Sequence, residues 1–297
     1  MSTSSPSETV SIVVGANGAF GSVERCLTAL EPQVHSGGGV EVIVCGATPS
    51  DDTVRSQFPF ARFETRPGML VPELWSAGID LSTGTIVALT ISPMEAADDW
   101  VATMRDRLGL GSHVDALGGA IDAGKGLRLV DWAEYFCRYA ADMPPFTAHE
   151  SVDLPGDNAA YRRDALLRVR ETWADGFWEP EVHRELKTTG STLVHDPGLV
   201  VYQGRSAGFG AFVRQRLVHG RAYGHQRGVR FGVVRNFAGV VLAFGVPGIL
   251  LLRQAGAVLA KGRHRGSLVA SLPAMLAYDL AWAVGEARGH LDVLTRR

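Results

Sequence analysis

Two glutamates in the second half of the chain have the surroundings of a proton acceptor. Glu179 and Glu181 lie in the segment GFWEPEVHREL, where Pro180 suits the first turn of a helix. Trp178 would partly shield Glu179 from water, and such desolvation raises a carboxyl pKa toward the range useful for a general base. The structural alternative is an acidic first turn that interacts favourably with the helix dipole. Both interpretations require a helix that begins at these residues.

A long basic segment is the second candidate for chemistry. Residues 197–278 contain no Asp or Glu and eleven Lys or Arg residues, although the whole chain has a formal net charge of −2. Without these eleven positive charges the remainder of the chain carries −13. Guanidinium groups match phosphate oxygens, so we expect the segment to face anionic phosphates, either of a ligand or of lipids. The nearly balanced total argues against a general nucleic-acid binder.

Several other kinds of site find no support in the sequence. His183 and His219 do not have the spacing of zinc ligands, and no GxSxG motif, Walker A motif or paired catalytic Cys and His occurs. Cys26, Cys45 and Cys137 form no CxxC pair, so we expect reduced structural thiols. The first residues, MSTSSPSET, have neither the basic nor the apolar region of a secretory signal. We therefore expect the protein to act on the cytoplasmic side.

Short apolar strands alternate with helices in the N-terminal part of the chain. Strands are expected at 10–14, 40–45, 61–64 and 85–89, and helices at 23–30, 74–81 and 99–109. This alternation predicts an α/β fold with a Rossmann-like, doubly wound, mostly parallel sheet that binds ligands at the carboxyl ends of its strands. Later elements are a strand at 116–121, an aromatic stretch at 130–146, a helix at 180–189 and an interrupted strand at 192–201.

Two apolar stretches follow the basic segment. Residues 237–252 contain no charged residue and are bounded by Arg235 and Arg253. Residues 268–284 contain a single charged residue before the last, Asp279. A helix needs roughly 20 residues to cross a bilayer core, so the first stretch is short for a span. An interfacial or re-entrant helical hairpin is the favoured interpretation, with two buried helices of a soluble domain as the alternative.

Six sequence blocks, in order, resemble glycosyltransferase family 2, whose members have the GT-A fold. The blocks are SIVVGANGAFGSVERCL, VEVIVCGATPSDDT, LWSAGIDLSTGTIVAL before DDWV, GDNAAYRRDAL, GFWEPEVHRELKTTG and LVHDPGLVVYQ. They extend over about residues 9–230, and the basic and apolar tail resembles a membrane-associated bacterial branch of the family. The resemblance implies transfer of a sugar from a nucleotide diphosphate sugar with inversion. That reaction needs a general base for the acceptor and neutralisation of the leaving diphosphate.

The resemblance also implies roles for particular residues. It places Glu179 as the general base, with Glu181 as the second candidate. The residues implied in donor binding are Gly15, Ala16, Asn17, Gly46, Ala47, Thr90, Ser92, Asn158, Arg216, His219 and Arg221. An ordinary strand-to-helix turn at 15–17 and an Asx turn at Asn158 are the structural alternatives.

Two departures from the family pattern concern the acidic residues. Gly46 and Ala47 stand where the family usually has an aspartate pair that grips the base. Residues 90–93, TISP, stand where it usually has a DxD motif that coordinates Mg²⁺ or Mn²⁺. Hydroxyls are poor sole ligands for these cations, so we expect a metal-independent or displaced site. The displaced candidates are Glu95, Asp98 and Asp99, and the cationic substitutes are Arg214, Arg216, His219 and Arg221.

The sequence therefore predicts a GT-A domain over residues 1–205 and a basic, apolar, membrane-associating helical region over residues 206–297. The expected partners are a nucleotide-sugar donor and an anionic membrane surface at the cytoplasmic face of the cell membrane, with no nucleic acid. The acceptor is unknown, and a lipid-linked one is favoured. A catalytically inactive GT-A scaffold that binds another membrane glycosyltransferase is the alternative. A dehydrogenase is excluded because GANGAFG lacks the GxGxxG spacing and no acidic residue ends the second strand.

Overall fold

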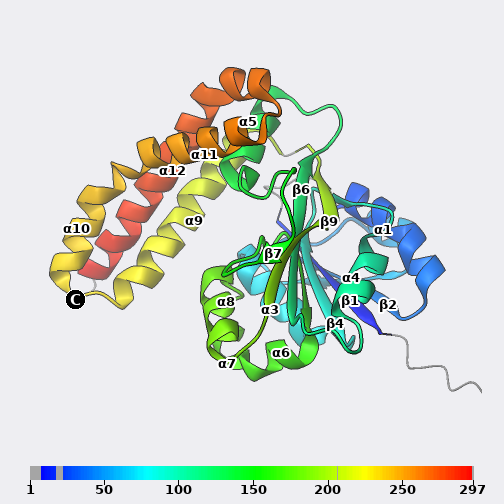
Figure 1. Ribbon diagram of the computed structural model, residues 1–297. Helices are drawn as coiled ribbons and strands as arrows, with labels where there is room; N and C mark the ends of the chain where they lie inside the picture. The colour runs from blue at the N-terminus through cyan, green and yellow to red at the C-terminus, as the bar shows by residue number, and fades with distance from the viewer. Residues whose placement is uncertain (1–7, 18–22, 206, 296–297) are drawn as a thin grey trace, which may run out of the picture. The chain divides into compact units, whose positions relative to one another are not determined.

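The computed structural model describes residues 8–17, 23–205 and 207–295. The chain divides into two units, each built from two segments (Figure 1). The α/β unit comprises Met1–Gly124 and Pro144–Gly204, and the helical unit comprises Lys125–Met143 and Arg205–Arg297. The helical unit thus includes a segment from the middle of the chain as well as the C-terminal region.

One mixed sheet forms the centre of the α/β unit. Within the described residues its strand order is β3-β2-β1-β4-β8-β6-β9-β5, and β7 pairs with β9. The strands are β1 (Val10–Ala16), β2 (Val40–Gly46), β3 (Ala61–Thr65), β4 (Ile86–Ile91), β5 (Met94–Ala96), β6 (Ala116–Ala123), β7 (His149–Glu150), β8 (Asn158–Arg162) and β9 (Leu193–Gln203). Strands β1, β2, β3, β4, β6 and β9 share one direction, because β8 is antiparallel to both β4 and β6. The predicted α/β fold with a mostly parallel sheet is confirmed.

The antiparallel strand β8 joins the two parallel parts of the sheet. It enters between β4 and β6 with Thr90 opposite Asn158 and Gly118 opposite Ala159. The start of β8 therefore lies at the same edge of the sheet as the carboxyl ends of β1, β2, β4, β6 and β9. We call this edge the C-terminal edge, and it is the edge at which α/β sheets bind ligands.

Helices cover both faces of this sheet. Helices α1 (Glu24–Gly37) and α4 (Trp100–Leu108) lie on one face and α3 (Val71–Leu81) and α8 (Glu179–Thr188) on the other (Figure 1). The shorter helices are α2 (Asp52–Gln57), α6 (Arg163–Arg168) and α7 (Arg170–Trp173). The valine, isoleucine and leucine side chains of β1 and β4 are buried between these layers, which explains why these two strands contain almost no polar side chains.

Residues next to the helix termini illustrate how local sequence sets these elements. The side chain of Asp51 accepts a hydrogen bond from the backbone N–H of Thr53, which caps α2 at 2.9 Å. Asp99 occupies the corresponding position before α4, but its side chain makes no capping hydrogen bond. Cys26 and Cys45 are free and buried, and desolvation raises the pKa of the Cys45 thiol to about 11.

The interruption predicted in the last strand is a break in the register of β9 against β6. Gly119 pairs with Asp196, whereas the next residue, Ala120, pairs with Val200. The extra residues of β9, 197–199, form the irregularity within the strand whose interruption the sequence predicted. Beyond it β9 continues to Gln203, at the C-terminal edge.

The helical unit contains α5 (Leu129–Tyr139) and the four C-terminal helices. These are α9 (Phe209–Val229), α10 (Val233–Ala243), α11 (Val246–Lys261) and α12 (Arg265–Thr295). Helices α9 and α12 approach closely through glycines, since a Cβ at Gly224 would lie 2.3 Å from the carbonyl oxygen of Glu286. A Cβ at Gly289 would likewise lie 2.2 Å from the carbonyl oxygen of Arg221. Small residues four apart allow this backbone contact, as in helix pairs of membrane proteins.

The two apolar stretches of the sequence take different forms. The first is divided between α10 and α11, which are bent by 58° at the break around Gly245. Pro247 stands in the first turn of α11, where its missing N–H costs no helical hydrogen bond. The second stretch lies within α12, which is long and apolar enough to cross a membrane, although half of its apolar segment is buried inside the protein. Taken together, the bent pair of α10 and α11 is also long and apolar enough to cross a membrane.

Candidate active site

The turn after β4 is anchored to the loop before β8. Thr90 is buried, and its hydroxyl donates to the carbonyl oxygen of Asp157 at 3.0 Å. The indole N–H of Trp75 donates to the carbonyl oxygen of Thr90 at 2.8 Å. Ser92, also buried, donates its backbone N–H to the carbonyl oxygen of Gly15 at 3.1 Å. The residues at the end of β4 are therefore fixed against β1 and against the loop at 154–157.

Asn158 holds three strands together at the C-terminal edge. Its side-chain oxygen accepts from the indole N–H of Trp100 at 2.8 Å. Its side-chain nitrogen donates to the carbonyl oxygens of Ala120 and Leu199 at 2.9 and 3.0 Å. A Cβ at Gly119 would lie 2.3 Å from that nitrogen, so glycine is needed for this close packing. Asn158 is fully buried, and these contacts give its side chain a structural role.

Glu179 starts helix α8 and lies against the same loop. Its carboxylate is so close to Gly156 that a Cβ there would lie 2.6 Å from Oε1 of Glu179. Asp157, the next residue of the loop, is the one that accepts the hydrogen bond from Thr90. Glu179 is partly buried, as expected for a carboxylate beside Trp178. The structure thus brings together three predicted site residues, Thr90, Asn158 and Glu179, around residues 156–158, and Glu181 lies one step further into α8.

A buried polar chain that the sequence did not suggest lies next to Glu179. The hydroxyl of Tyr161 is 2.7 Å from Nε2 of His183, and Nδ1 of the same ring is in very close contact with the carboxylate of Asp153. Burial, followed by the negative charges of Glu179 and Asp153, raises the pKa of Tyr161 well above its usual value. Tyr161 therefore keeps its proton, and the ring of His183 links its hydroxyl to the carboxylate of Asp153.

This chain connects β8, α8 and the 153–158 loop. Tyr161 lies in β8 and His183 lies one turn after Glu179 in α8, so their hydrogen bond fixes the start of the helix against the sheet. His183 lacks any zinc-ligand pattern and has a structural partner on each ring nitrogen. The only feature of the sequence that could have linked His183 to Glu179 is their four-residue spacing, which puts both residues on one face of a helix.

The ends of β1 and β2 consist of small residues for steric reasons. A Cβ at Gly46 would lie 2.8 Å from the carbonyl oxygen of Thr48, and one at Gly15 would lie 3.1 Å from the indole nitrogen of Trp75. The N–H of Ala47 donates to the carbonyl oxygen of Ala16 at 2.9 Å, which joins the two strand ends. These strand ends lie at the C-terminal edge, where the sequence predicted the donor. Asn17 follows them, and the next residues of the glycine-rich turn, 18–22, lie outside the described residues.

The four basic residues proposed for the donor diphosphate, Arg214, Arg216, His219 and Arg221, belong to the helical unit. Arg216 pairs with buried Asp279 at 3.3 Å and lies over the ring of Trp282 at 4.4 Å. Arg221 pairs with Asp292 at 2.6 Å. His219 is half-buried within the same unit. Arg216 and Arg221 thus already have carboxylate partners, and phosphate binding by this group stays a prediction.

The side chains near the end of β4 do not fit the Mg²⁺ or Mn²⁺ that the family resemblance implies. Residues 90–93 offer only hydroxyl oxygens, and Glu95 is paired with Arg25 at 3.3 Å. Across the described part of the chain, no three His, Cys, Asp or Glu side chains are grouped so that they could hold a metal ion. Hard divalent cations require several oxygen ligands, preferably carboxylates. We therefore assign no metal-dependent step to these residues.

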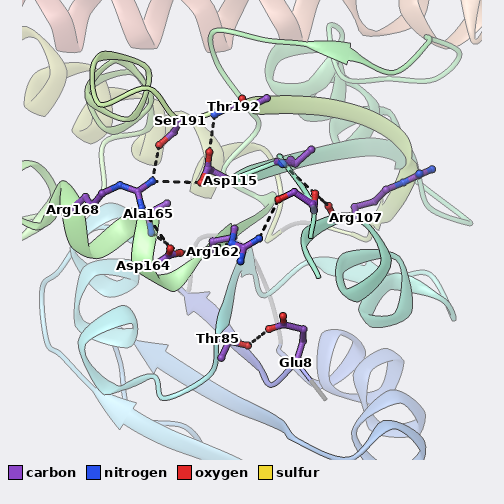
Figure 2. Close-up of polar contacts among 12 residues, drawn as sticks. Glu8, Thr85, Arg107, Asp115, Arg162, Asp164, Ala165, Arg168, Ser191 and Thr192 are labelled. Carbon is purple, nitrogen blue, oxygen red and sulfur yellow. Dashed lines mark hydrogen bonds and ion pairs between the residues drawn. The ribbon is translucent and has the colours of Figure 1, made fainter. Parts of the chain in front are cut away.

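The opposite edge of the sheet contains a cavity whose charged lining residues include an ion pair. This cavity of about 340 Å³ lies beside Thr85, Arg162 and Asp164, and Arg162 is within 3.8 Å of Asp164. Figure 2 shows the neighbouring network, in which Asp115 accepts from the guanidinium of Arg168 at 3.4 Å and from the N–H of Thr192 at 2.9 Å. Asp115 and Thr192 directly precede β6 and β9, so this network fixes where the two strands begin.

Comparison with known proteins gives information on the fold. No family model matches the chain, and no curated protein matches it in sequence. The solved mannosyltransferase PcManGT from Pyrobaculum calidifontis, in complex with GDP-Man and Mn²⁺, is 17% identical with a TM-score of 0.52 over 94% of this chain and 87% of that chain. Glucosyl-3-phosphoglycerate synthase from Mycobacterium tuberculosis, in complex with phosphoglyceric acid, is 18% identical with a TM-score of 0.42 over 68% and 72%. Together with the sheet order and the C-terminal edge, the likeness to the mannosyltransferase shows that this chain has a GT-A-like fold, the fold of nucleotide-sugar glycosyltransferases.

Proposed function

We propose that this protein is an inverting glycosyltransferase of the family-2 type, which transfers a sugar from a nucleotide diphosphate sugar to an acceptor hydroxyl. The observation that supports this proposal most strongly is the position of Glu179. Its carboxylate lies over Gly156, in the loop that Thr90 and Asn158 attach to the C-terminal edge of the sheet. A proton acceptor and the expected donor-binding edge therefore belong to one rigidly connected group of residues.

The proposed reaction is a single displacement. Glu179 accepts the proton of the acceptor hydroxyl while that oxygen attacks the anomeric carbon of the donor sugar. The bond from the anomeric carbon to the diphosphate oxygen breaks, and the nucleoside diphosphate leaves with the electron pair. Attack from the face opposite the leaving group inverts the anomeric configuration. Glu179 ends the step protonated and returns its proton to solvent.

Replacement of Glu179 tests this assignment. We expect Glu179→Gln to lower the rate of nucleoside diphosphate release by about 10² to 10⁴ while leaving the affinity for the donor unchanged, because only the proton acceptor is removed. The donor is to be found by calorimetry with UDP-, GDP- and dTDP-sugars, in EDTA and in Mn²⁺. Glu181→Gln is the matched control, two residues further along α8. An equal loss in both variants, or a loss in Glu181→Gln alone, would contradict the assignment to Glu179.

The same titrations separate the enzyme from an inactive scaffold. If the wild-type protein binds none of these nucleotide sugars under either condition, the transferase proposal fails. Binding without turnover toward any acceptor preparation would instead support a GT-A scaffold for another membrane glycosyltransferase. Donor binding that is insensitive to EDTA would agree with the absence of a carboxylate group for a metal among the described residues.

We further propose that the helical unit associates with the cytoplasmic face of the cell membrane and gives access to a lipid-linked acceptor. Large apolar side chains of α10 and α11 are strongly exposed, including Val234 at 82% and Leu252 at 77%. A contiguous set of such side chains on a soluble protein marks an interaction surface. The eleven basic residues of 197–278, without any acidic residue, would favour anionic head groups beside that apolar surface.

Vesicle sedimentation tests the membrane proposal on the full-length protein. We expect the wild-type protein to sediment with phosphatidylglycerol-containing vesicles. The double variant Val234→Asp, Leu252→Asp should stay in the supernatant. Leu110→Asp is the matched control, because Leu110 is equally apolar and 68% exposed but lies in the α/β unit. Sedimentation of the double variant that equals that of the wild type would disprove this surface as the membrane contact.

A further inference from the structure

Two buried side chains at the C-terminal edge contain polar atoms without partners. Within the part of the chain that the structure describes, neither Oγ of Ser92 nor Oε1 and Nε2 of Gln203 have a hydrogen-bond partner. Ser92 is 0% exposed and Gln203 is 1% exposed. Buried polar atoms in folded proteins are nearly always paired, so atoms that are not paired indicate a missing partner.

These two residues flank the same turn. Ser92 lies in the turn between β4 and β5, and Gln203 ends β9 directly opposite Met94, the first residue of β5. The N–H of Gly204 donates to the carbonyl oxygen of Pro93 at 2.7 Å, which closes the strand end onto the turn. The unpaired atoms therefore belong to the part of the edge where the family resemblance expects the donor to be gripped.

The chemistry of the unpaired atoms limits what the missing partner can be. A carboxamide offers a donor and an acceptor, and a serine hydroxyl also serves as either. A divalent cation would leave the Nε2 group of Gln203 unused. It would find beside Gly204 only the carboxylate of Glu95, which is already paired with Arg25. A phosphate group would leave Oε1 of Gln203 facing another acceptor. Sugar hydroxyls, which both donate and accept, can pair with all three atoms.

We propose that Ser92 and Gln203 bind hydroxyl groups of the donor's sugar, and that Gln203 determines which sugar is accepted. This inference rests on the proposed transferase function and adds Gln203 as a specificity-determining residue. A polar site built for a hydroxyl discriminates strongly against a ligand that lacks it, because its own groups are then left unpaired. Both side chains are covered in the unliganded protein, so sugar binding includes a local rearrangement of the β4-β5 turn.

The substitution Gln203→Met separates ligand binding from a structural role. Methionine has a similar volume and removes both polar atoms. If the carboxamide makes hydrogen bonds only to a bound sugar, its removal leaves the melting temperature of the unliganded protein unchanged or higher. Affinity for the free nucleoside diphosphate should stay within about twofold, while affinity for the corresponding nucleotide sugar should fall by about tenfold or more. Calorimetry with UDP, GDP and dTDP and with their hexose conjugates measures both.

Gln33→Met provides the matched control. Gln33 is also a buried glutamine of the α/β unit, but its nitrogen donates to the carbonyl oxygen of Ala97 and its oxygen accepts from the N–H of Val101, both at 2.9 Å. We expect this variant to melt at a lower temperature without any selective loss of sugar affinity. The inference about Gln203 is overturned if Gln203→Met melts as low as Gln33→Met and binds nucleotide and nucleotide sugar like the wild type. If the wild-type protein binds no nucleoside diphosphate or nucleotide sugar at all, the proposed function fails as well.

Discussion

The side chain of Glu179 lies so close to Gly156 that a Cβ at position 156 would come within 2.6 Å of Oε1, so any larger residue there must displace the glutamate. This contact makes the loop before β8 part of the surroundings of the proposed base. It leads to a prediction that does not alter the base itself.

Gly156→Ala should displace Glu179 and lower turnover by about tenfold, because misplacement of a reacting group by about 1 Å is costly. The melting temperature should change little, since the carboxylate is only partly buried and can move toward solvent. Steady-state kinetics of nucleoside diphosphate release measure the effect. Gly266→Ala is the control, because a Cβ there meets nothing within 4 Å. An active Gly156→Ala variant with wild-type turnover would argue against the position of Glu179 as the reacting geometry.

Tyr161→Phe should destabilise the α/β unit by about 1–2 kcal/mol, because Nε2 of buried His183 loses its partner. The pKa of Tyr161 is raised in the folded protein, so this residue contributes stability that is complete below about pH 10 and is lost as the pH rises above it. Urea unfolding at pH 7 and at alkaline pH measures both effects. The difference in unfolding free energy between wild type and variant should shrink toward high pH. Tyr202→Phe, at an exposed position, should show neither effect.

Glu41 connects the beginnings of β1, β2 and β4 and should make stability depend on acid. Burial raises the pKa of its carboxyl group, but hydrogen bonds from Ser11, Thr83 and Gly84 outweigh that effect and hold the pKa below its usual value. The stabilisation is therefore present above about pH 4.3 and is lost as the pH falls through the lowered pKa. Glu41→Gln should cost about 1 kcal/mol at pH 7, allowing for partial exposure, and less at pH 3.

Urea unfolding over pH 3 to about 7 checks the Glu41 prediction, since that range includes the ordinary carboxyl pKa. Glu171→Gln, at an exposed site, is the control and should be neutral throughout. A difference between Glu41→Gln and wild type that grows as the pH falls would contradict the sign of the shift.

Asn158→Ala should be the most damaging of these substitutions for stability. It leaves the indole N–H of Trp100 and the carbonyl oxygens of Ala120 and Leu199 unpaired in the interior. Each unpaired buried group costs about 1–3 kcal/mol, so we expect a loss of about 3 kcal/mol or more. Chemical denaturation measures it. The exposed Thr189→Ala is the comparison, and a loss under about 1 kcal/mol for Asn158→Ala would show that water replaces these contacts.

The local elements of the α/β unit were predictable because their signals are local. The apolar strands at 10–14, 40–45 and 85–89 lie within β1, β2 and β4 or overlap them closely, and Pro180 marked the first turn of α8. The family-like order of the sequence blocks then pointed to Glu179 and Asn158 before either could be placed in space. Short apolar runs and proline positions act over a few residues, so they are visible without the fold.

Contacts between distant residues were not predictable from the sequence. The central place of β8 depends on pairing Asn158 with Thr90, and no local pattern in NAAYR indicates that partner. The buried connection of Tyr161 through His183 to Asp153 likewise joins three elements. The aromatic stretch after residue 129 became α5 of the helical unit because its apolar face packs on α12, far away in sequence. Such pairings are decided by tertiary packing and not by propensity.

The separation of α5 from the rest of the helical unit has a consequence for synthesis. Helix α5 is synthesised before β7, β8 and β9, and its main partner, α12, is synthesised only after all three strands. The apolar residues Ala133, Tyr135 and Phe136 of α5 are buried in the folded protein. They therefore stay exposed while the sheet is completed. During that interval α5 is a natural binding site for a chaperone, and the nascent chain is most prone to aggregate then.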